Sequence, residues 1–194
     1  MKTNSKHLGL VTKKFNEFFF VDLKNKENFG NSERFLCKVR KSINFKDQFI
    51  YVGDEVEIDN IDLTSKRAVI TSLKKRQNLL NRPSVANISN IYITFSVEEP
   101  KLNLSQVNRF LISAESMGVE VSLVLTKCDL ISDTKRSSLI DKFEKWGYQA
   151  ITLNLEKSDY FNNFLADLKQ KECSIFMGPS GVGKTTLLNM IIPG

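Results

Sequence analysis

Histidine is nearly absent from this 194-residue chain, and cysteine is scarce. His7 is the only histidine, so no cluster has the spacing of metal ligands, and we interpret His7 as a surface residue near the N-terminus. Cys37, Cys128 and Cys173 are odd in number, widely spaced and without a CxxC pair. These absences exclude a disulfide framework and predict free thiols in a reducing compartment, which favours the cytoplasm.

Long apolar runs are also missing. The run Phe18-Phe-Phe-Val21 is flanked by Glu17 and Asp22 and falls far short of the roughly 18 apolar residues of a membrane span. The N-terminus lacks the apolar core of a signal peptide. We therefore expect a monomer that has no membrane partner.

Charge of one sign does not dominate the second half of the chain, and the net charge of +6 comes from an excess of Lys and Arg in the first half. Residues 1–89 hold 17 Lys and Arg against 10 Asp and Glu, whereas residues 90–194 hold 11 against 12. This excess indicates that the first half meets a polyanion, with nucleic acid as the leading candidate. The alternative is a solvated basic surface that serves only solubility.

The first 75 residues are predicted to form an all-β barrel. Five short runs rich in Phe, Val and Ile are separated by turn-like groups, at residues 8–11, 18–23, 35–40, 55–58 and 67–73. A basic module of five strands fits the OB-fold, which commonly binds oligonucleotides, and other small barrels fit nearly as well. Residues 76–89 are interpreted as a linker. The basic cluster at residues 74–83 is either a phosphate contact or a solvated part of that linker.

The organisation changes in residues 90–194, where strands alternate with helices. Strands are expected at residues 90–97, 119–125, 148–153 and 174–177, and helices at residues 103–118, 132–147, 158–170 and from Thr186 onward. Such alternation predicts a parallel, doubly wound α/β sheet. The apolar stripes of the helices are explained by core packing alone.

The run Gly178-Pro-Ser-Gly-Val-Gly-Lys-Thr185 fits the phosphate-binding pattern GxxxxGK[ST], between an expected strand and an expected helix. Its glycines let backbone amides approach phosphates, and the helix N-terminus adds to this anion site. We assign Lys184 to the β- and γ-phosphates and Thr185 to Mg²⁺, and give both a part in catalysis. The alternative is a Gly-rich turn with a solvated lysine. The predicted nucleotide-binding residues of this loop are Gly178, Pro179, Ser180, Gly181, Val182, Gly183, Lys184, Thr185 and Thr186.

A second motif, Thr126-Lys-Cys-Asp129, follows an apolar strand and matches the guanine-recognition pattern [N/T]KxD. Guanine presents N1–H and its 2-amino group as paired donors, and the Asp129 carboxylate would accept both. The stem of Lys127 would lie against the base, and Thr126 would tie the loop together. The alternative is an ordinary surface turn, but the end of a parallel strand is where open α/β sheets bind ligands.

The order of the two motifs is reversed relative to ordinary GTPases, because Asp129 lies 49 residues before Gly178. This order indicates a circular permutation. A sheet brings strand ends together whatever the order of the connections, so the site can still form.

These residues resemble the RsgA (YjeQ) family of circularly permuted GTPases that depend on the small ribosomal subunit. The resemblance includes Val52-Gly-Asp54, Lys75-Arg-Gln-Asn-Leu-Leu-Asn-Arg-Pro83 and Arg109-Phe-Leu111, and it covers essentially the whole chain. It implies an OB-fold, a permuted GTPase domain in residues 90–194 and a C-terminal zinc domain. It also implies GTP and GDP with Mg²⁺ as ligands, 16S rRNA and the 30S subunit as partners, and subunit-stimulated GTP hydrolysis during late maturation.

Three features depart from that family. Thr126 stands where Asn is usual, and Thr152-Leu-Asn-Leu155 stands where a Ser-rich loop that contacts the base is expected. The sequence ends at Gly194, before the switch motif DxxG and the zinc domain, so this chain holds no zinc ligands and we expect it to hydrolyse GTP poorly.

Three hypotheses follow. The leading one is a GTPase that assists 30S maturation, with an RNA-binding barrel. The alternative is an RNA-binding module that carries an incomplete, catalytically weak nucleotide fold. A small-molecule P-loop kinase is the third, and it leaves both the guanine motif and the basic barrel without a role.

Overall fold

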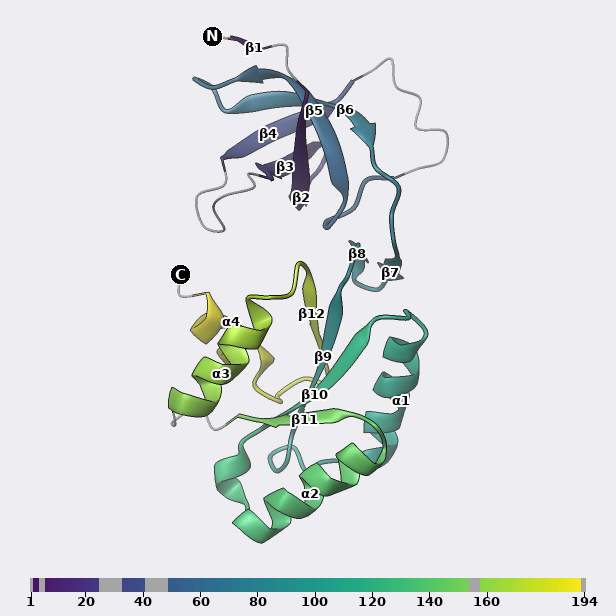
Figure 1. The fold of residues 1–194 in the computed structure, drawn as a ribbon, viewed down its shortest axis with the longest axis vertical. Coiled ribbons are helices and arrows are strands. Elements are labelled where there is room, and N and C mark those ends of the chain that lie inside the picture. The colour runs from purple at the N-terminus through teal and green to yellow at the C-terminus, as the bar shows by residue number, and fades with distance from the viewer. Residues whose placement is uncertain (1, 4–5, 25–32, 41–48, 154–157, 193–194) are drawn as a thin grey trace. The chain divides into compact units, whose positions relative to one another are not determined.

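Two units divide the chain, Met1–Asn87 and Ile88–Gly194. The computed structural model describes residues 2–3, 6–24, 33–40, 49–153 and 158–192 (Figure 1). Each unit is built around its own sheet.

The first unit is a closed five-stranded barrel. Its strands are β2 (His7–Phe15), β3 (Phe18–Leu23), β4 (Arg34–Val39), β5 (Glu55–Asp62) and β6 (Arg67–Leu73). They pair in the order β5-β2-β3-β4-β6, and β5 pairs with β6 to close the barrel. Only the β4–β6 pair of these is parallel, and the short β1 (Lys2–Thr3) adds to the outer edge of β5. This arrangement confirms the predicted OB-like barrel.

The barrel closes around side chains that alternate along each strand. Val11, Val21, Phe35 and Ile70 are fully buried, because every second residue of a strand points to the same face. The sequence indicated these five strands by their content of Phe, Val and Ile and by the turn-like groups between them. The ends of the strands were harder to predict. Strand β2 continues beyond a bulge after Val11 through polar residues, which a content of Phe, Val and Ile does not indicate.

Residues 76–87 fold onto the barrel. They contain the hairpin of β7 (Leu79–Asn81) and β8 (Ser84–Ala86). The Ala86 N–H donates to the Val52 carbonyl at 2.8 Å, and the Asn87 side-chain amide donates to the Gly53 carbonyl at 2.9 Å. Gly53 has φ +88°, and a Cβ there would lie 2.1 Å from the Ala86 carbonyl oxygen, so only glycine allows this approach.

A buried ion pair joins the same segment to the barrel. Asp54 is fully buried, and its carboxylate accepts from Arg76 at 2.6 and 2.7 Å and from the Tyr51 N–H at 2.8 Å. Lys74 pairs with Glu57. Two residues of the basic cluster at residues 74–83, Lys74 and Arg76, are therefore paired with carboxylates of the barrel unit. Fewer positive charges remain for phosphates than the sequence suggests.

The second unit is a parallel sheet in the order β11-β10-β9-β12. Its strands are β9 (Asn90–Ser96), β10 (Glu120–Thr126), β11 (Gln149–Thr152) and β12 (Ser174–Met177). All three pairings are parallel, as the alternation of strands and helices predicted. Every residue of β9 is buried, because it lies between two strands and between two helical layers.

Helices cover both faces of this sheet. They are α1 (Leu104–Glu115), α2 (Asp133–Lys145), α3 (Ser158–Leu168) and α4 (Lys184–Ile191). Phe95 packs edge-on against Phe110 of α1, while Tyr92 packs with Phe164 of α3 on the opposite face of β9 (Figure 1). The side chain of Asn103 caps α1 by accepting the Gln106 N–H at 3.2 Å.

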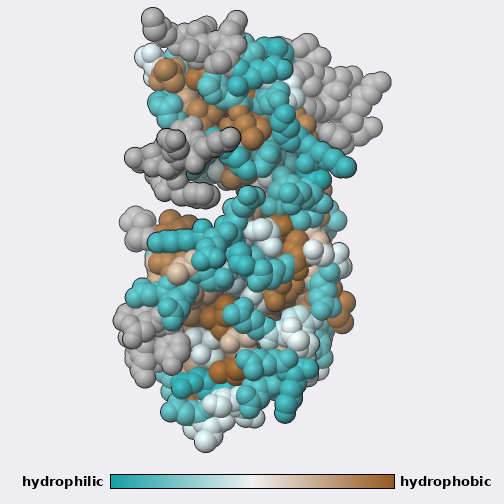
Figure 2. Space-filling model, viewed as in Figure 1, coloured by the Kyte–Doolittle hydropathy of each residue, from teal (hydrophilic) through white to brown (hydrophobic). Residues whose placement is uncertain are grey.

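Most of the described surface that Figure 2 shows is hydrophilic in both units. In the view of Figure 2 apolar residues reach the surface in separate patches rather than in one continuous band. Phe15 and Ile112, exposed by 61% and 69%, lie in different units. Exposed apolar residues that are scattered in this way are normal for a protein surface.

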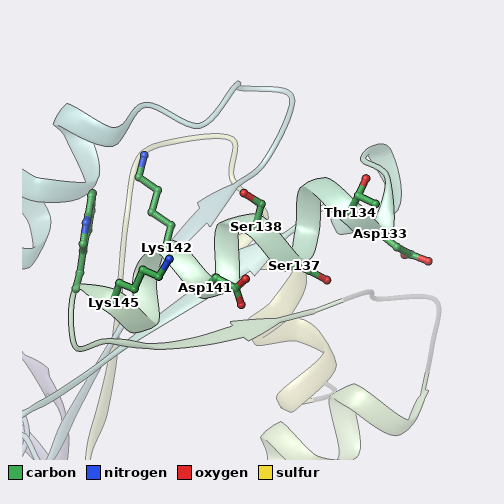
Figure 3. A pocket seen from close by; sticks show the side chains of 8 residues that line it. Asp133, Thr134, Ser137, Ser138, Asp141, Lys142 and Lys145 are labelled. Carbon is green, nitrogen blue, oxygen red and sulfur yellow. The ribbon is translucent and has the colours of Figure 1, made fainter.

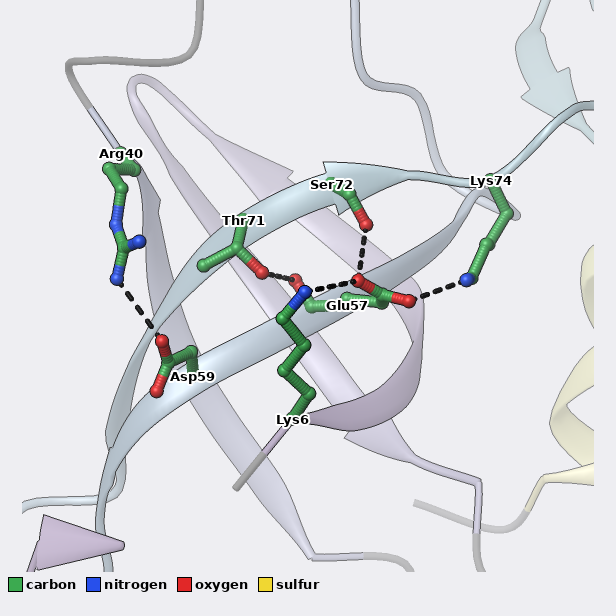
Figure 4. Close-up of polar contacts among 7 residues, drawn as sticks. All are labelled: Lys6, Arg40, Glu57, Asp59, Thr71, Ser72 and Lys74. Carbon is green, nitrogen blue, oxygen red and sulfur yellow. Dashed lines mark hydrogen bonds and ion pairs between the residues drawn. The ribbon is translucent and has the colours of Figure 1, made fainter. Parts of the chain in front are cut away.

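The carboxylate of Glu57 makes the stability of the barrel depend on pH in the acid range. It accepts from Lys74 and from Ser72, and Lys6 lies 3.6 Å away (Figure 4). The hydrogen bond from Lys74 contributes most to lowering the pKa of Glu57 from 4.5 to about 2, followed by that from Ser72. Because the folded-state pKa is depressed, this contribution is present above the unfolded pKa and is lost as the pH falls toward 2.

We expect Glu57→Gln to flatten the fall in melting temperature between about pH 5 and pH 2. Thermal unfolding followed by circular dichroism across that range measures it. Glu17→Gln is the matched control, because Glu17 is exposed and forms no ion pair with the described residues. Parallel pH profiles for Glu57→Gln and the unmodified chain would contradict this role.

Candidate functional site

Three loops meet at one edge of the parallel sheet. They follow the carboxyl ends of β9, β10 and β12, which are neighbours in the sheet. The loops comprise residues 97–103, 127–130 and 178–183, and the last two are the two sequence motifs. Because parallel strands all end at the same edge, motifs that are 49 residues apart in the chain come together here.

The phosphate motif leaves β12 through a glycine that lies against β9. Gly178 has φ +148°, and a Cβ there would lie 2.1 Å from the Thr94 carbonyl oxygen. Gly183 has φ +92° and forms the N-cap of α4, which begins at Lys184, two residues earlier than the sequence pattern indicated. Between these glycines Val182 is buried and anchors the loop, while Ser180 and Gly181 are exposed.

Lys184 lies half-buried at the mouth of this loop. Its ammonium donates to the Gly178 carbonyl at 2.9 Å and to the Pro179 carbonyl. Among the described residues no carboxylate pairs with it, so its charge is uncompensated. Thr185 and Thr186 are exposed in the first turn of α4.

This arrangement fits a phosphate group bound with Mg²⁺. The N-terminus of α4 supplies free N–H groups and a positive dipole, Lys184 supplies a full charge, and Thr185 supplies an accessible hydroxyl. Magnesium is held in such sites by one or two protein oxygens together with phosphates and water. Within the described ranges no group of three or more His, Cys, Asp or Glu is placed to hold a metal ion.

Thr126 connects the two motifs directly. It is buried at the end of β10, and its hydroxyl donates to the Val182 carbonyl of the phosphate loop at 2.6 Å. The Phe95 carbonyl lies farther away, at 3.3 Å. The side chain thus reaches across the end of β9 and ties the guanine motif to the phosphate motif.

The rest of the guanine motif alternates between buried and exposed positions. Cys128 is buried, and burial raises the pKa of its thiol to about 11, so it is an unreactive anchor. Asp129 is exposed beside it and forms no ion pair with another described residue. Lys127 has φ +55°, and its ammonium donates to the Glu99 carbonyl.

Sequence reasoning missed the third loop, residues 97–103. The Ser96 hydroxyl donates to the Pro100 carbonyl at 2.7 Å, and the Cδ of Pro100 lies 3.8 Å from where a Cβ of Gly181 would stand. No motif marks this loop. Its position after the most buried strand, between the two motif strands, was the available signal.

The segment expected to contact the base is only partly described. Leu153 is buried, and its N–H donates to the Leu125 carbonyl at 2.8 Å. Residues 154 and 155 lie outside the described residues, so we assign no base contact to this segment.

A hollow of about 670 Å³ along α2 is separate from these loops (Figure 3). All of its lining side chains come from α2 and Trp146, and none belongs to either motif. Figure 3 shows Lys142 and Lys145 extending from the helix beside it.

No helix in the described ranges is long and apolar enough to cross a membrane.

Comparisons with known proteins agree with this geometry. Residues 73–194 match the family model described as RsgA GTPase. The chain is 36% identical over 197 residues to the small ribosomal subunit biogenesis GTPase RsgA of Prochlorococcus marinus strain NATL1A. That alignment covers 98% of this chain and 63% of the relative, so the chain spans about 63% of the length of such curated relatives.

Solved structures show the same architecture. The crystal structure of YjeQ from Thermotoga maritima superposes with a TM-score of 0.84 at 30% identity, over 98% of this chain and 66% of that one. YloQ, described as a circularly permuted GTPase, superposes with a TM-score of 0.80 at 26% identity, over 97% of this chain and 65% of that one.

We expect Thr126→Val to weaken GDP binding by roughly tenfold, or about 1.4 kcal/mol. The substitution keeps the side-chain volume but leaves the Val182 carbonyl without its donor, which loosens the phosphate loop. Fluorescence titration with a labelled GDP measures it. Thr126→Ser retains the hydroxyl and is the control; equal affinities for the valine variant and the unmodified chain would refute the connection.

Proposed function

The chain belongs to the RsgA GTPase family, and from this membership we propose that it is a guanine-nucleotide-binding protein that hydrolyses GTP while assisting maturation of the small ribosomal subunit. One observation carries the proposal: the Thr126–Val182 hydrogen bond joins a guanine motif and a phosphate motif at one sheet edge. The names of the relatives support the ribosomal role. A soluble cytoplasmic monomer fits this role.

The phosphate loop binds the nucleotide's phosphates in this proposal. Backbone N–H groups of residues 180–186 and the Lys184 ammonium hold the phosphate oxygens, and the Thr185 hydroxyl holds Mg²⁺. Lys184 and Thr185 also stabilise charge that develops on the phosphate during transfer to water. We assign no described residue to positioning that water.

The guanine motif selects the base. The exposed Asp129 carboxylate accepts N1–H and the 2-amino group, and the stem of Lys127 lies along the ring. Adenine offers no such pair of donors, so the carboxylate would be left unpaired against it. A small-molecule kinase would not need this residue.

We expect Asp129→Asn to weaken GDP binding by at least about 100-fold, because two charge-assisted hydrogen bonds are lost. The amide of the new side chain can donate to the 2-oxo group of xanthine, so affinity for xanthosine diphosphate rises. Calorimetry with GDP, xanthosine diphosphate and ADP measures both changes. Equal affinity of the unmodified chain for GDP and ADP would refute guanine selection.

The barrel docks on RNA of the small subunit, 16S rRNA, in this proposal. Six carboxylates of the barrel unit pair with Lys or Arg among the described residues: Asp22, Glu33, Asp54, Glu55, Glu57 and Asp59. Figure 4 shows the ion pairs that Glu57 and Asp59 of β5 form. The charges of the Lys and Arg residues that pair with these carboxylates are therefore compensated.

The end of the β2–β3 hairpin differs from these ion-paired positions. Lys13 and Lys14 are exposed there and pair with no described carboxylate, and Phe15 is 61% exposed. The Lys38 ammonium lies 4.5 Å from the centre of the Phe18 ring. Lysines beside one exposed and one half-buried aromatic ring suit a single-stranded nucleic acid, because its phosphates pair with the cations and its bases stack on the rings. An RNA-binding module without catalysis would use the same surface.

We expect RNA binding to be salt-sensitive, and Lys14→Gln to reduce the slope of log affinity against log salt by about 0.7 for single-stranded RNA. Filter binding of a fragment of 16S rRNA at several salt concentrations measures it. Lys24→Gln is the control, because Lys24 is already paired with Glu55. Affinity that is independent of salt, or an equal effect of both variants, would contradict this surface.

A further inference from the structure

We propose that residues 97–102 form a wall of the nucleotide site and that the ion pair between Glu98 and Lys135 positions Lys127 against the base. The inference rests on the proposed function. Glu98 and Lys135 are positioning residues here, since they act on the nucleotide through Lys127.

The loop is closed on itself and fastened to the sheet. The Leu102 N–H donates to the Val97 carbonyl at 3.3 Å, and the Ser96 hydroxyl donates to the Pro100 carbonyl at 2.7 Å. The Val97 N–H donates to the Thr126 carbonyl at 3.1 Å. The loop is thus attached to the first residue of the guanine motif.

One main-chain group of this loop holds Lys127. The Lys127 ammonium donates to the Glu99 carbonyl, so the long stem of the lysine extends toward the loop. Both residues have left-handed backbones, with φ +52° at Glu99 and φ +55° at Lys127. Side chains with a Cβ rarely adopt this conformation, and it persists where the surroundings impose it, often at functional sites.

A second attachment fixes the loop from the opposite side. The Glu98 carboxylate accepts from the Lys135 ammonium at 2.7 Å, and Lys135 lies in the first turn of α2, just after the guanine motif. The hydrogen bond from Lys135 holds the pKa of Glu98 below its usual value. Glu98 immediately precedes the residue whose carbonyl holds Lys127, so the ion pair limits where that carbonyl lies.

The inference predicts an effect on base binding but not on phosphate binding. Lys184 and the α4 N-terminus have no contact with Glu98 or Lys135 among the described hydrogen bonds and ion pairs. Because the pair is partly exposed, with 52% of the Lys135 side chain accessible, the expected change is moderate. Loss of such a pair corresponds to a change of about two- to fivefold.

The test compares GDP with inorganic pyrophosphate on the 194-residue chain. We expect Glu98→Gln and Lys135→Gln each to weaken GDP binding about two- to fivefold, the double variant to lose no more than either, and pyrophosphate affinity to stay unchanged. In a Lys127→Met background Glu98→Gln should add no further loss. Glu144→Gln, an exposed carboxylate in the last part of α2, is the control with the same charge change.

Two results would overturn the inference while leaving the proposed function standing. The first is GDP binding by Glu98→Gln as tight as that of the unmodified chain. The second is an equal loss of GDP and pyrophosphate affinity, which would mean a general loosening of the loops. Failure of the unmodified chain to prefer GDP over ADP would instead overturn the proposed function, and the inference with it.

Discussion

The hydrogen bond from the Thr126 hydroxyl to the Val182 carbonyl is the interaction on which the candidate site depends. It requires that β10 and β12 lie on either side of β9 and that their carboxyl ends reach the same edge of the sheet. That placement comes from the buried central strand, whose parallel pairings align residues 90–96 with β10 and residues 90–93 with β12. Chain order therefore does not matter to the site, because strand registers and not connections bring the motifs together.

The barrel unit depends on a different constraint, the burial of one charged pair. A fully buried Asp54 requires a partner, and Arg76 supplies two hydrogen bonds from a segment beyond the last barrel strand. Removal of one member of such a pair leaves an uncompensated buried charge, which costs about 3–5 kcal/mol. The hairpin of β7 and β8 consequently belongs to the barrel and not to a free linker.

Sequence patterns predicted those parts of the structure that have a local cause. Short runs of Phe, Val and Ile between turn-like groups indicated the barrel strands, and the glycine spacing with its flanking strand and helix indicated the phosphate loop. The start of α4 at Lys184 was missed because the pattern of apolar residues begins only after the glycine cap. The loop at residues 97–103 was missed because its role comes from the sheet order, in which β9 separates the two motif strands. The internal pairing of Arg76 also depends on a distant partner, Asp54, that no local pattern indicates.

Net charge illustrates the same limit. The excess of positive residues in the first half suggests a uniformly basic surface, but four of these residues form ion pairs with carboxylates of β5. Lys13 and Lys14, which have no carboxylate partner among the described residues, lie beside the exposed Phe15 ring at the end of the β2–β3 hairpin. A long-range field from the total charge can still attract a polyanion, but a specific contact needs charges without partners. In the proposed function, the surface that meets RNA is therefore set by which lysines the fold leaves unpaired, and this depends on strand pairing more than on composition.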